Sequence, residues 1–153
     1  METPLFRSEE DIKFHLCALR RLAFADGVFC DVEKTVLTNT IRAYCDQFPD
    51  LVFSNLIEID FSEEDFTNAL ERLKESPVQA KLLIKDLVTL GFVDNDYCAA
   101  ERAMVANYGT KMGISLETIN EIETLTEEML TIIKRLNFVI QGNISHGTVS
   151  IED

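Results

Sequence analysis

The sequence is short of basic residues, of long apolar stretches and of the residue clusters that mark most binding sites. Its 153 residues hold 14 Lys and Arg against 27 Asp and Glu, which gives a formal net charge of −13 at pH 7. Such a surface repels nucleic-acid backbones and anionic membranes, which argues against both as partners. No apolar run approaches the roughly 18 residues of a membrane-spanning helix. The first residues carry acids instead of a basic segment before an apolar stretch, so we expect no secretory signal and a cytoplasmic protein.

Cysteine and histidine are too scattered to predict a zinc site or a catalytic centre. The four cysteines stand at positions 17, 30, 45 and 98 without a Cys-x-x-Cys pair, and His15 lies far along the chain from His146. A Gly-rich phosphate loop and a metalloprotease histidine pair are missing as well. The sequence offers no serine or cysteine nucleophile that pairs with His15, so we expect a non-enzyme with reduced thiols.

Apolar residues at helical spacing predict one compact all-α domain over residues 1–142, of about seven helices, and a separate tail over 143–153. The helices are expected at about 9–26, 31–47, 51–57, 62–75, 77–90, 99–112 and 116–138. Ser8, Ser62, Ser76 and Ser115 precede four of them as N-caps, with Pro77 directly after Ser76, and Gly113 follows the sixth. The first and fifth helices are apolar around most of their surface, so we expect both to be central.

An internal repeat relates the two halves of the chain. Residues 22–34 align with 90–102 at a constant offset of 68 positions, and leucine, phenylalanine, aspartate, cysteine and glutamate recur in register. In each copy an apolar helix leads into a tight acidic turn, and a second helix begins near a cysteine, Cys30 or Cys98. We therefore predict two related helix–acidic turn–helix hairpins, joined by linking helices and closed by a long final helix.

The acids of the repeated turns are candidate ligands for a divalent cation. Asp26 and Asp94 follow helix C-termini, whose carbonyls already carry partial negative charge, so a cation would stabilise them. Carboxylate and carbonyl oxygens suit Ca²⁺ or Mg²⁺. The predicted ligand set is Asp26, Asp94, Asp96, Glu33 and Glu101. A structural interpretation stays open, because Asp-Gly is a common turn dipeptide and both glutamates stand where a capping box would place them.

The repeated motif resembles the TerB-like family, small helical domains named for tellurite-resistance operons. The resemblance rests on Ala25-Asp26-Gly27 after a helix, on Glu33 seven residues beyond the aspartate, and on the second copy; it covers roughly residues 10–136. The second copy departs from the pattern at Asn95, and cysteines replace the serine-like residue of the family. The resemblance implies an all-helical fold, metal-binding acids and a part in stress-response assemblies, without an established catalytic activity.

Cys30 and Cys98 also suggest a thiol sensor, because a helix N-terminus can lower the pKa of a thiol. Neighbouring acids oppose the thiolate, however, and a packed, inert thiol is the simpler interpretation.

The final helix offers a second kind of binding surface. Apolar residues follow 3-and-4 spacing along it: Leu116, Ile119, Ile122, Leu125, Met129, Ile132, Ile133, Leu136 and Val139. Such a seam either closes a helical core or pairs two chains as a coiled coil, so a homodimer stays open. The other side of this helix carries acids that we expect to be solvated: Glu121, Glu123, Glu127 and Glu128. The alternative to a cation-binding module is therefore a metal-independent module that docks a protein partner through its acidic surface or this helix.

Overall fold

The computed structural model describes residues 8–25, 31–45, 60–93 and 97–142, and this part of the chain is all-helical. It contains six α-helices: α1 (Glu9–Ala23), α2 (Asp31–Cys45), α4 (Glu63–Arg72), α5 (Pro77–Phe92), α6 (Ala99–Lys111) and α7 (Leu116–Gln141). One 3₁₀ turn, Leu73–Glu75, follows α4. The helix predicted over 51–57 and the tail predicted over 143–153 lie outside the described residues, so the count of seven is not confirmed.

Serine side chains mark where three of the helices begin. In each case the hydroxyl oxygen accepts a hydrogen bond from the backbone N–H three residues further on, which satisfies one of the free donors of the first turn. The capping serines are Ser8, Ser62 and Ser115, with donor–acceptor distances of 3.3, 3.1 and 3.1 Å. These caps confirm the predicted starts of α1, α4 and α7.

The ends of the last two helices depend on where glycine stands. Gly113 ends α6 with φ +79°, in the left-handed region that glycine adopts without a steric penalty. The N–H of Ile114 then donates to the carbonyl of Gly109 at 2.8 Å, which closes the helix end. The final helix extends to Gln141 instead of the predicted residue 138, because no glycine or proline interrupts it before Gly142.

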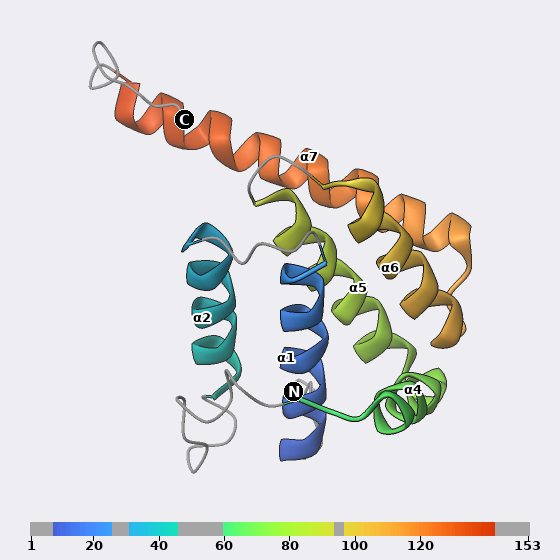
Figure 1. Cartoon of the computed structure of the whole chain (residues 1–153). Coiled ribbons are helices and arrows are strands. Elements are labelled where there is room, and N and C mark those ends of the chain that lie inside the picture. Colours follow the sequence, from blue (N-terminus) through green and yellow to red (C-terminus); the bar gives the residue numbers. More distant parts are fainter. Residues whose placement is uncertain (1–7, 26–30, 46–59, 94–96, 143–153) are drawn as a thin grey trace, which may run out of the picture.

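The central pair α1 and α5 confirms the prediction made from their apolar surfaces. They pack against each other, α2 packs against α1, and α6 packs against α5 (Figure 1). Eight of their largest side chains are at most 2% exposed: Ile12, Leu16, Leu19, Leu22, Leu83, Ile84, Leu87 and Leu90. Burying one such side chain contributes about 1.5–3 kcal/mol, so the α1–α5 contact holds the two hairpins together.

The two hairpins have the same orientation in the molecule. Figure 1 shows the C-terminal ends of α1 and α5 at the same end of the structure, where the chain leaves each helix toward its hairpin partner. The second helices begin at Asp31 and Ala99, directly after Cys30 and Cys98, as the repeat predicts. α7 packs across α5 and α6 with its first half and then continues past them (Figure 1).

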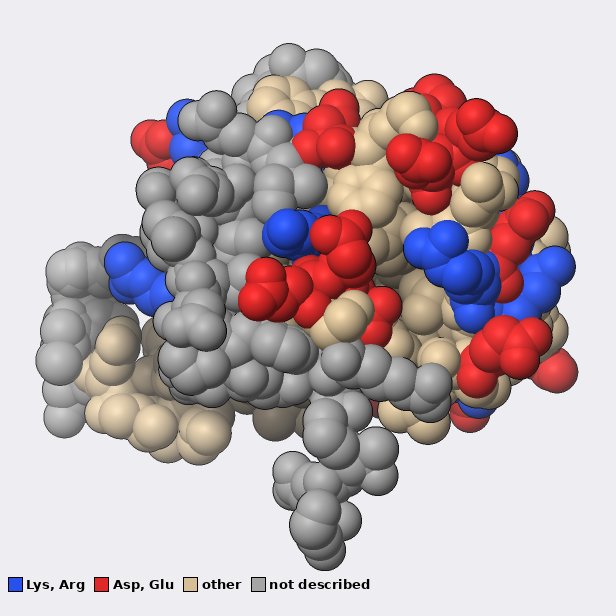
Figure 2. All heavy atoms as spheres, turned by 90° about the horizontal axis from the view of Figure 1, so that it is seen from below, with Lys and Arg blue, Asp and Glu red and all other residues tan. Residues whose placement is uncertain are grey.

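Acidic side chains are spread over the described surface. Figure 2, seen from below, shows them in several groups with fewer basic groups among them, in keeping with the net charge of −13. Of the helices in the described ranges, none combines the length and the apolar character needed to cross a bilayer.

Candidate functional site

Four of the five predicted cation ligands lie beyond what the structure describes. Asp26, Asp94 and Asp96 fall in the undescribed ranges, and Glu33 belongs to α2 but its side chain is not described. Among the side chains that are described, no group of three or more His, Cys, Asp or Glu comes together in a way that would hold a metal ion. The cation site therefore stays a prediction from the sequence.

Glu101, the fifth predicted ligand, caps the start of α6. It is 1% exposed, and its Oε1 accepts a hydrogen bond from the backbone N–H of Cys98 at 3.0 Å. Cys98 is the N-cap residue, so the two form the capping box that their spacing predicts. The carboxylate thus has a structural task at the helix N-terminus, where negative charge is stabilised.

The two described thiols occupy different settings. Cys98 is half-buried at the start of α6, and Cys17 is buried in α1. The Cys17 thiol donates to Oδ1 of Asp60 at 3.4 Å. Burial, and then this hydrogen bond, raise the pKa of Cys17, which lowers its thiolate fraction. Cys17 is therefore a core residue, as predicted, whereas Cys30 and the side chain of Cys45 lie outside the described part.

His15 is almost completely buried in α1. It is 1% exposed, and its Nε2 lies 2.8 Å from Oδ2 of Asp86, whose side chain is 14% exposed. The pair joins α1 to α5 inside the core. A buried imidazole held by a carboxylate in this way satisfies its own polar groups and stabilises the packing of the two central helices.

A hollow of about 610 Å³ opens beside the C-terminal half of α1. Its lining includes Arg20, Arg21, Asp60, Glu63 and Tyr108. The guanidinium of Arg21 donates to Glu63 at 2.9 Å and to Asp60 at 3.1 Å, and it lies 4.0 Å from the ring centre of Phe66. Its charge is therefore neutralised by the protein, and the cluster ties α1 to the start of α4.

α7 changes its surroundings halfway along its length. In the first half Ile119 and Thr126 are buried, 2% and 4% exposed. Glu123 points inward as well: it accepts a hydrogen bond from the hydroxyl of Tyr97 at 2.6 Å and lies 3.8 Å from Arg102. The expectation that Glu123 is solvated is therefore wrong, because α6 and the segment before it supply two donors for its carboxylate.

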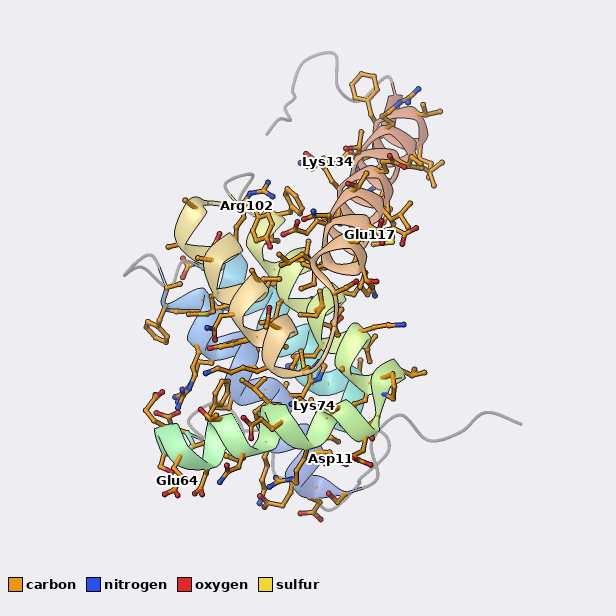
Figure 3. The ribbon with its side chains drawn as sticks, turned by 90° about the vertical axis from the view of Figure 1, so that its right-hand side faces the viewer. Asp11, Glu64, Lys74, Arg102, Glu117 and Lys134 are labelled. Carbon is orange, nitrogen blue, oxygen red and sulfur yellow. The ribbon has the colours of Figure 1, made fainter. Side chains whose placement is uncertain are left out.

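The second half of α7, residues 127–141, leaves the body of the molecule; we call it the α7 arm. Every residue of the arm is exposed except Leu130, which is half-buried. Figure 3 shows this stretch, which carries Lys134, rising past the other helices, whereas Glu117 marks the end that lies against them. The arm therefore presents nearly all of its side chains to solvent.

Large apolar side chains cover one side of the arm. Leu125, just before it, begins a row spaced by four, three, four and three residues: Leu125, Met129, Ile132, Leu136 and Val139. These five residues, which we call the seam, are between 39% and 72% exposed. Ile133 and Ile140 extend one edge of the seam and are 45% and 71% exposed. The row predicted from the sequence lacks Ile140, although Ile140 stands seven residues after Ile133 and four after Leu136.

Comparison with family models, with curated proteins and with solved structures finds no match for this chain. The resemblance to TerB-like domains therefore stays a prediction, and the geometry of the chain itself has to carry the functional proposal.

Proposed function

We propose that this chain is a non-catalytic interaction module whose docking surface is the seam of the α7 arm. One observation carries the proposal: a row of large apolar side chains, 39% to 72% exposed, lies on a helix that projects from the body. A contiguous exposed apolar patch of this kind marks a binding surface in soluble proteins more often than a packing defect. Its burial against a partner would contribute hydrophobic free energy that folding alone leaves unused.

The spacing of the seam favours a helical partner. A row at alternating intervals of four and three residues stays on one side of a helix and accepts the side chains of a second helix between its own. The arm also lacks the charge excess of the rest of the chain, since residues 127–141 hold two acids and two bases. An apolar helix of a protein partner can therefore approach it without strong repulsion.

Two reactive side chains of the chain have structural surroundings that support a non-catalytic role. His15 is enclosed between α1 and α5 in contact with Asp86, and Cys17 is buried with its thiol bonded to Asp60. Each side chain contributes to holding elements together. The function that the geometry supports best is therefore binding through the arm.

Site-specific photo-crosslinking in cells tests this proposal. A photoreactive amino acid replaces Leu136 in the seam, and the matched control places it at Thr131, which is exposed on another side of the same arm. We expect the Leu136 variant to give a discrete crosslinked product with a protein chain, identified by mass spectrometry, and the Thr131 variant to give at most a weak one. Equal crosslinking at both positions, or none at either, contradicts the proposal.

The divalent-cation hypothesis keeps its own test. Thermal unfolding of chelator-treated protein is measured with Ca²⁺ and Mg²⁺, since a cation at 100 times its dissociation constant adds about 2.7 kcal/mol to the free energy of unfolding. A rise of the melting temperature that disappears in the Asp26→Asn/Asp94→Asn variant supports a cation site in the repeated turns. An unchanged melting temperature contradicts the cation site and supports a purely structural role for these aspartates at the helix ends. The interaction module is then the sole proposal.

A further inference from the structure

We infer that the seam of the α7 arm is occupied by the α7 arm of a second copy of this chain, packed antiparallel to the first. This inference rests on the proposed function, because both require the seam to be a docking surface. It goes further in naming the partner and its orientation. The residues on the two edges of the seam carry the argument.

The two edges of the seam differ in chemistry. One edge holds Ile133 and Ile140, which are exposed and apolar. The other edge holds Glu128 and Arg135, seven residues apart and both exposed. Neither of these two charges forms an ion pair within the described ranges of the chain. One side of the seam is thus apolar and the other is charged.

This asymmetry selects the antiparallel orientation. In a parallel helix pair each edge faces the opposite edge of the partner, so Ile133 would lie against the partner's Glu128 or Arg135. In an antiparallel pair each edge faces the same edge of the partner. The apolar edges then face each other, and the charged residues meet charged residues in water at the rim, where such pairs set orientation and partner choice.

One register satisfies both the seam and the charged edge. When Leu125 lies opposite the partner's Leu136, Met129 lies opposite the partner's Ile132. In the same register Glu128 comes beside the partner's Arg135, and two-fold symmetry repeats the attraction at the other end. Opposite charges therefore meet twice. The distribution of charge on the arm is complementary to itself.

The position of the body fits the same arrangement. Ile133 and Ile140 continue the line of Ile119 and Thr126, which are buried against the body of their own chain. In the antiparallel pair this line faces the same line of the partner, so Ile133 and Ile140 approach the body end of the partner's α7. The two bodies lie at opposite ends of the paired arms. Two molecules of charge −13 thus associate through their neutral segments and keep their acidic bodies apart.

Sedimentation equilibrium of the full chain tests the association. The seam is short, about 21 Å over fifteen residues, so we expect a monomer–dimer equilibrium within protein concentrations of about 5 to 500 µM. Leu136→Glu should abolish the dimer, whereas Thr131→Glu, which adds the same charge outside the seam, should leave it. Both residues are exposed, so circular dichroism should show the same helix content in the two variants.

Charge exchange across the edge tests the register. Glu128→Arg places two positive side chains together at each end and should weaken the dimer roughly tenfold, since two exposed pairs are lost at once. The double variant Glu128→Arg/Arg135→Glu restores opposite charges and should recover most of the affinity. Failure of the double variant to recover affinity contradicts this register.

Cysteine crosslinking tests the orientation. In the antiparallel register Leu125→Cys lies beside the Leu136→Cys of a second chain, within the Cα separation of about 4.4–6.8 Å that a disulfide requires. Under mild oxidation an equimolar mixture of the two variants should form a covalent dimer, and each variant alone should not. Crosslinking of each variant with itself indicates a parallel pair and overturns the inference.

The outcomes separate the inference from the proposed function. A chain that stays monomeric at every concentration, while Leu136 crosslinks to a different protein in cells, overturns the second copy as partner and keeps the arm as a docking surface. A monomer that also gives no crosslink at Leu136 overturns both. A dimer that Leu136→Glu leaves intact places the association elsewhere on the molecule and contradicts the inference directly.

Discussion

At the scale of single residues, the polar groups of the interior are used to join helices. His15 meets Asp86 between α1 and α5, Glu101 caps α6, and the hydroxyl of Tyr97 donates to Glu123 of α7. A buried polar group that lost its partner would cost about 1–3 kcal/mol, so each contact favours one packing of the helices over the alternatives. The interior polar residues thus specify how the helices are arranged.

The buried tyrosines predict how the fold responds to alkali. Burial raises the pKa of Tyr108 to about 12, and burial together with the hydrogen bond to Glu123 raises the pKa of Tyr97 further. The unfolded chain loses these protons near pH 10, before the folded chain does. The stability contributed by these groups is therefore intact below about pH 10 and is lost as pH rises toward 12.

We expect the phenolate absorbance of these two tyrosines to appear together with the loss of helical circular dichroism. Tyr108→Phe should make the stability fall less steeply between about pH 10 and 12, as measured by urea unfolding. The prediction is contradicted if both phenols titrate reversibly near pH 10 while the helix content stays unchanged.

At the scale of elements, α7 both closes the core and presents an exposed surface. The same 3-and-4 spacing of apolar residues marks both parts of the helix. Its first half closes the core with Ile119 and Thr126, and its second half carries an exposed seam. The helix is held at its start by Ser115, whose hydroxyl accepts from the N–H of Thr118 at 3.1 Å. The position of the arm therefore depends on a well-formed first turn.

Two serines before helices provide a matched test of this dependence. Ser115→Ala should lower the free energy of unfolding by about 1 kcal/mol, because a backbone N–H loses its acceptor. Ser76 precedes α5 but its side chain makes no capping bond, and Pro77 follows it. Ser76→Ala should therefore cost less than about 0.5 kcal/mol. Urea unfolding of both variants measures the difference, and equal costs would contradict the role given to Ser115.

At the scale of the whole molecule, the net charge of −13 opposes any association between copies. The paired hairpins belong to the body, and the arm is a segment in which charges balance and a row of apolar side chains is exposed. Hydrophobic burial of the seam therefore favours association through the arm, and the long-range repulsion between the two negative molecules opposes it. Salt affects the two differently, because added ions screen the repulsion and do not weaken the hydrophobic contact of the seam.

We expect the dimer to become tighter, by several-fold, as NaCl is raised from about 0.05 to 0.5 M, since the screening length shortens from beyond about 10 Å to a few Å. Sedimentation equilibrium at each salt concentration measures the dissociation constant. Leu136→Glu should remain monomeric throughout the series. A dimer that loosens with salt would mean that ion pairs, and not the seam, dominate the association.

Local chemistry explains what was predictable from the sequence. Helix starts follow from capping serines and Pro77, the end of α6 follows from Gly113, and the central place of α1 and α5 follows from apolar residues around most of their surface. The capping role open to Glu101 also follows from its spacing to Cys98. Each of these properties depends on residues of a single helix and the positions next to it, so the sequence carries the information directly.

Only the tertiary structure determined which of these side chains are buried and which polar groups they meet. Whether Glu123 faces water or Arg102, and whether His15 finds Asp86, depends on residues brought together from different helices. The apolar row of α7 reads the same from Ile119 to Val139, yet it is buried at one end and exposed at the other. Periodicity indicates that a helix has an apolar side. Where the neighbouring helices stop burying that side depends on how the helices are packed, which the sequence pattern does not give. That boundary makes the arm a candidate docking surface.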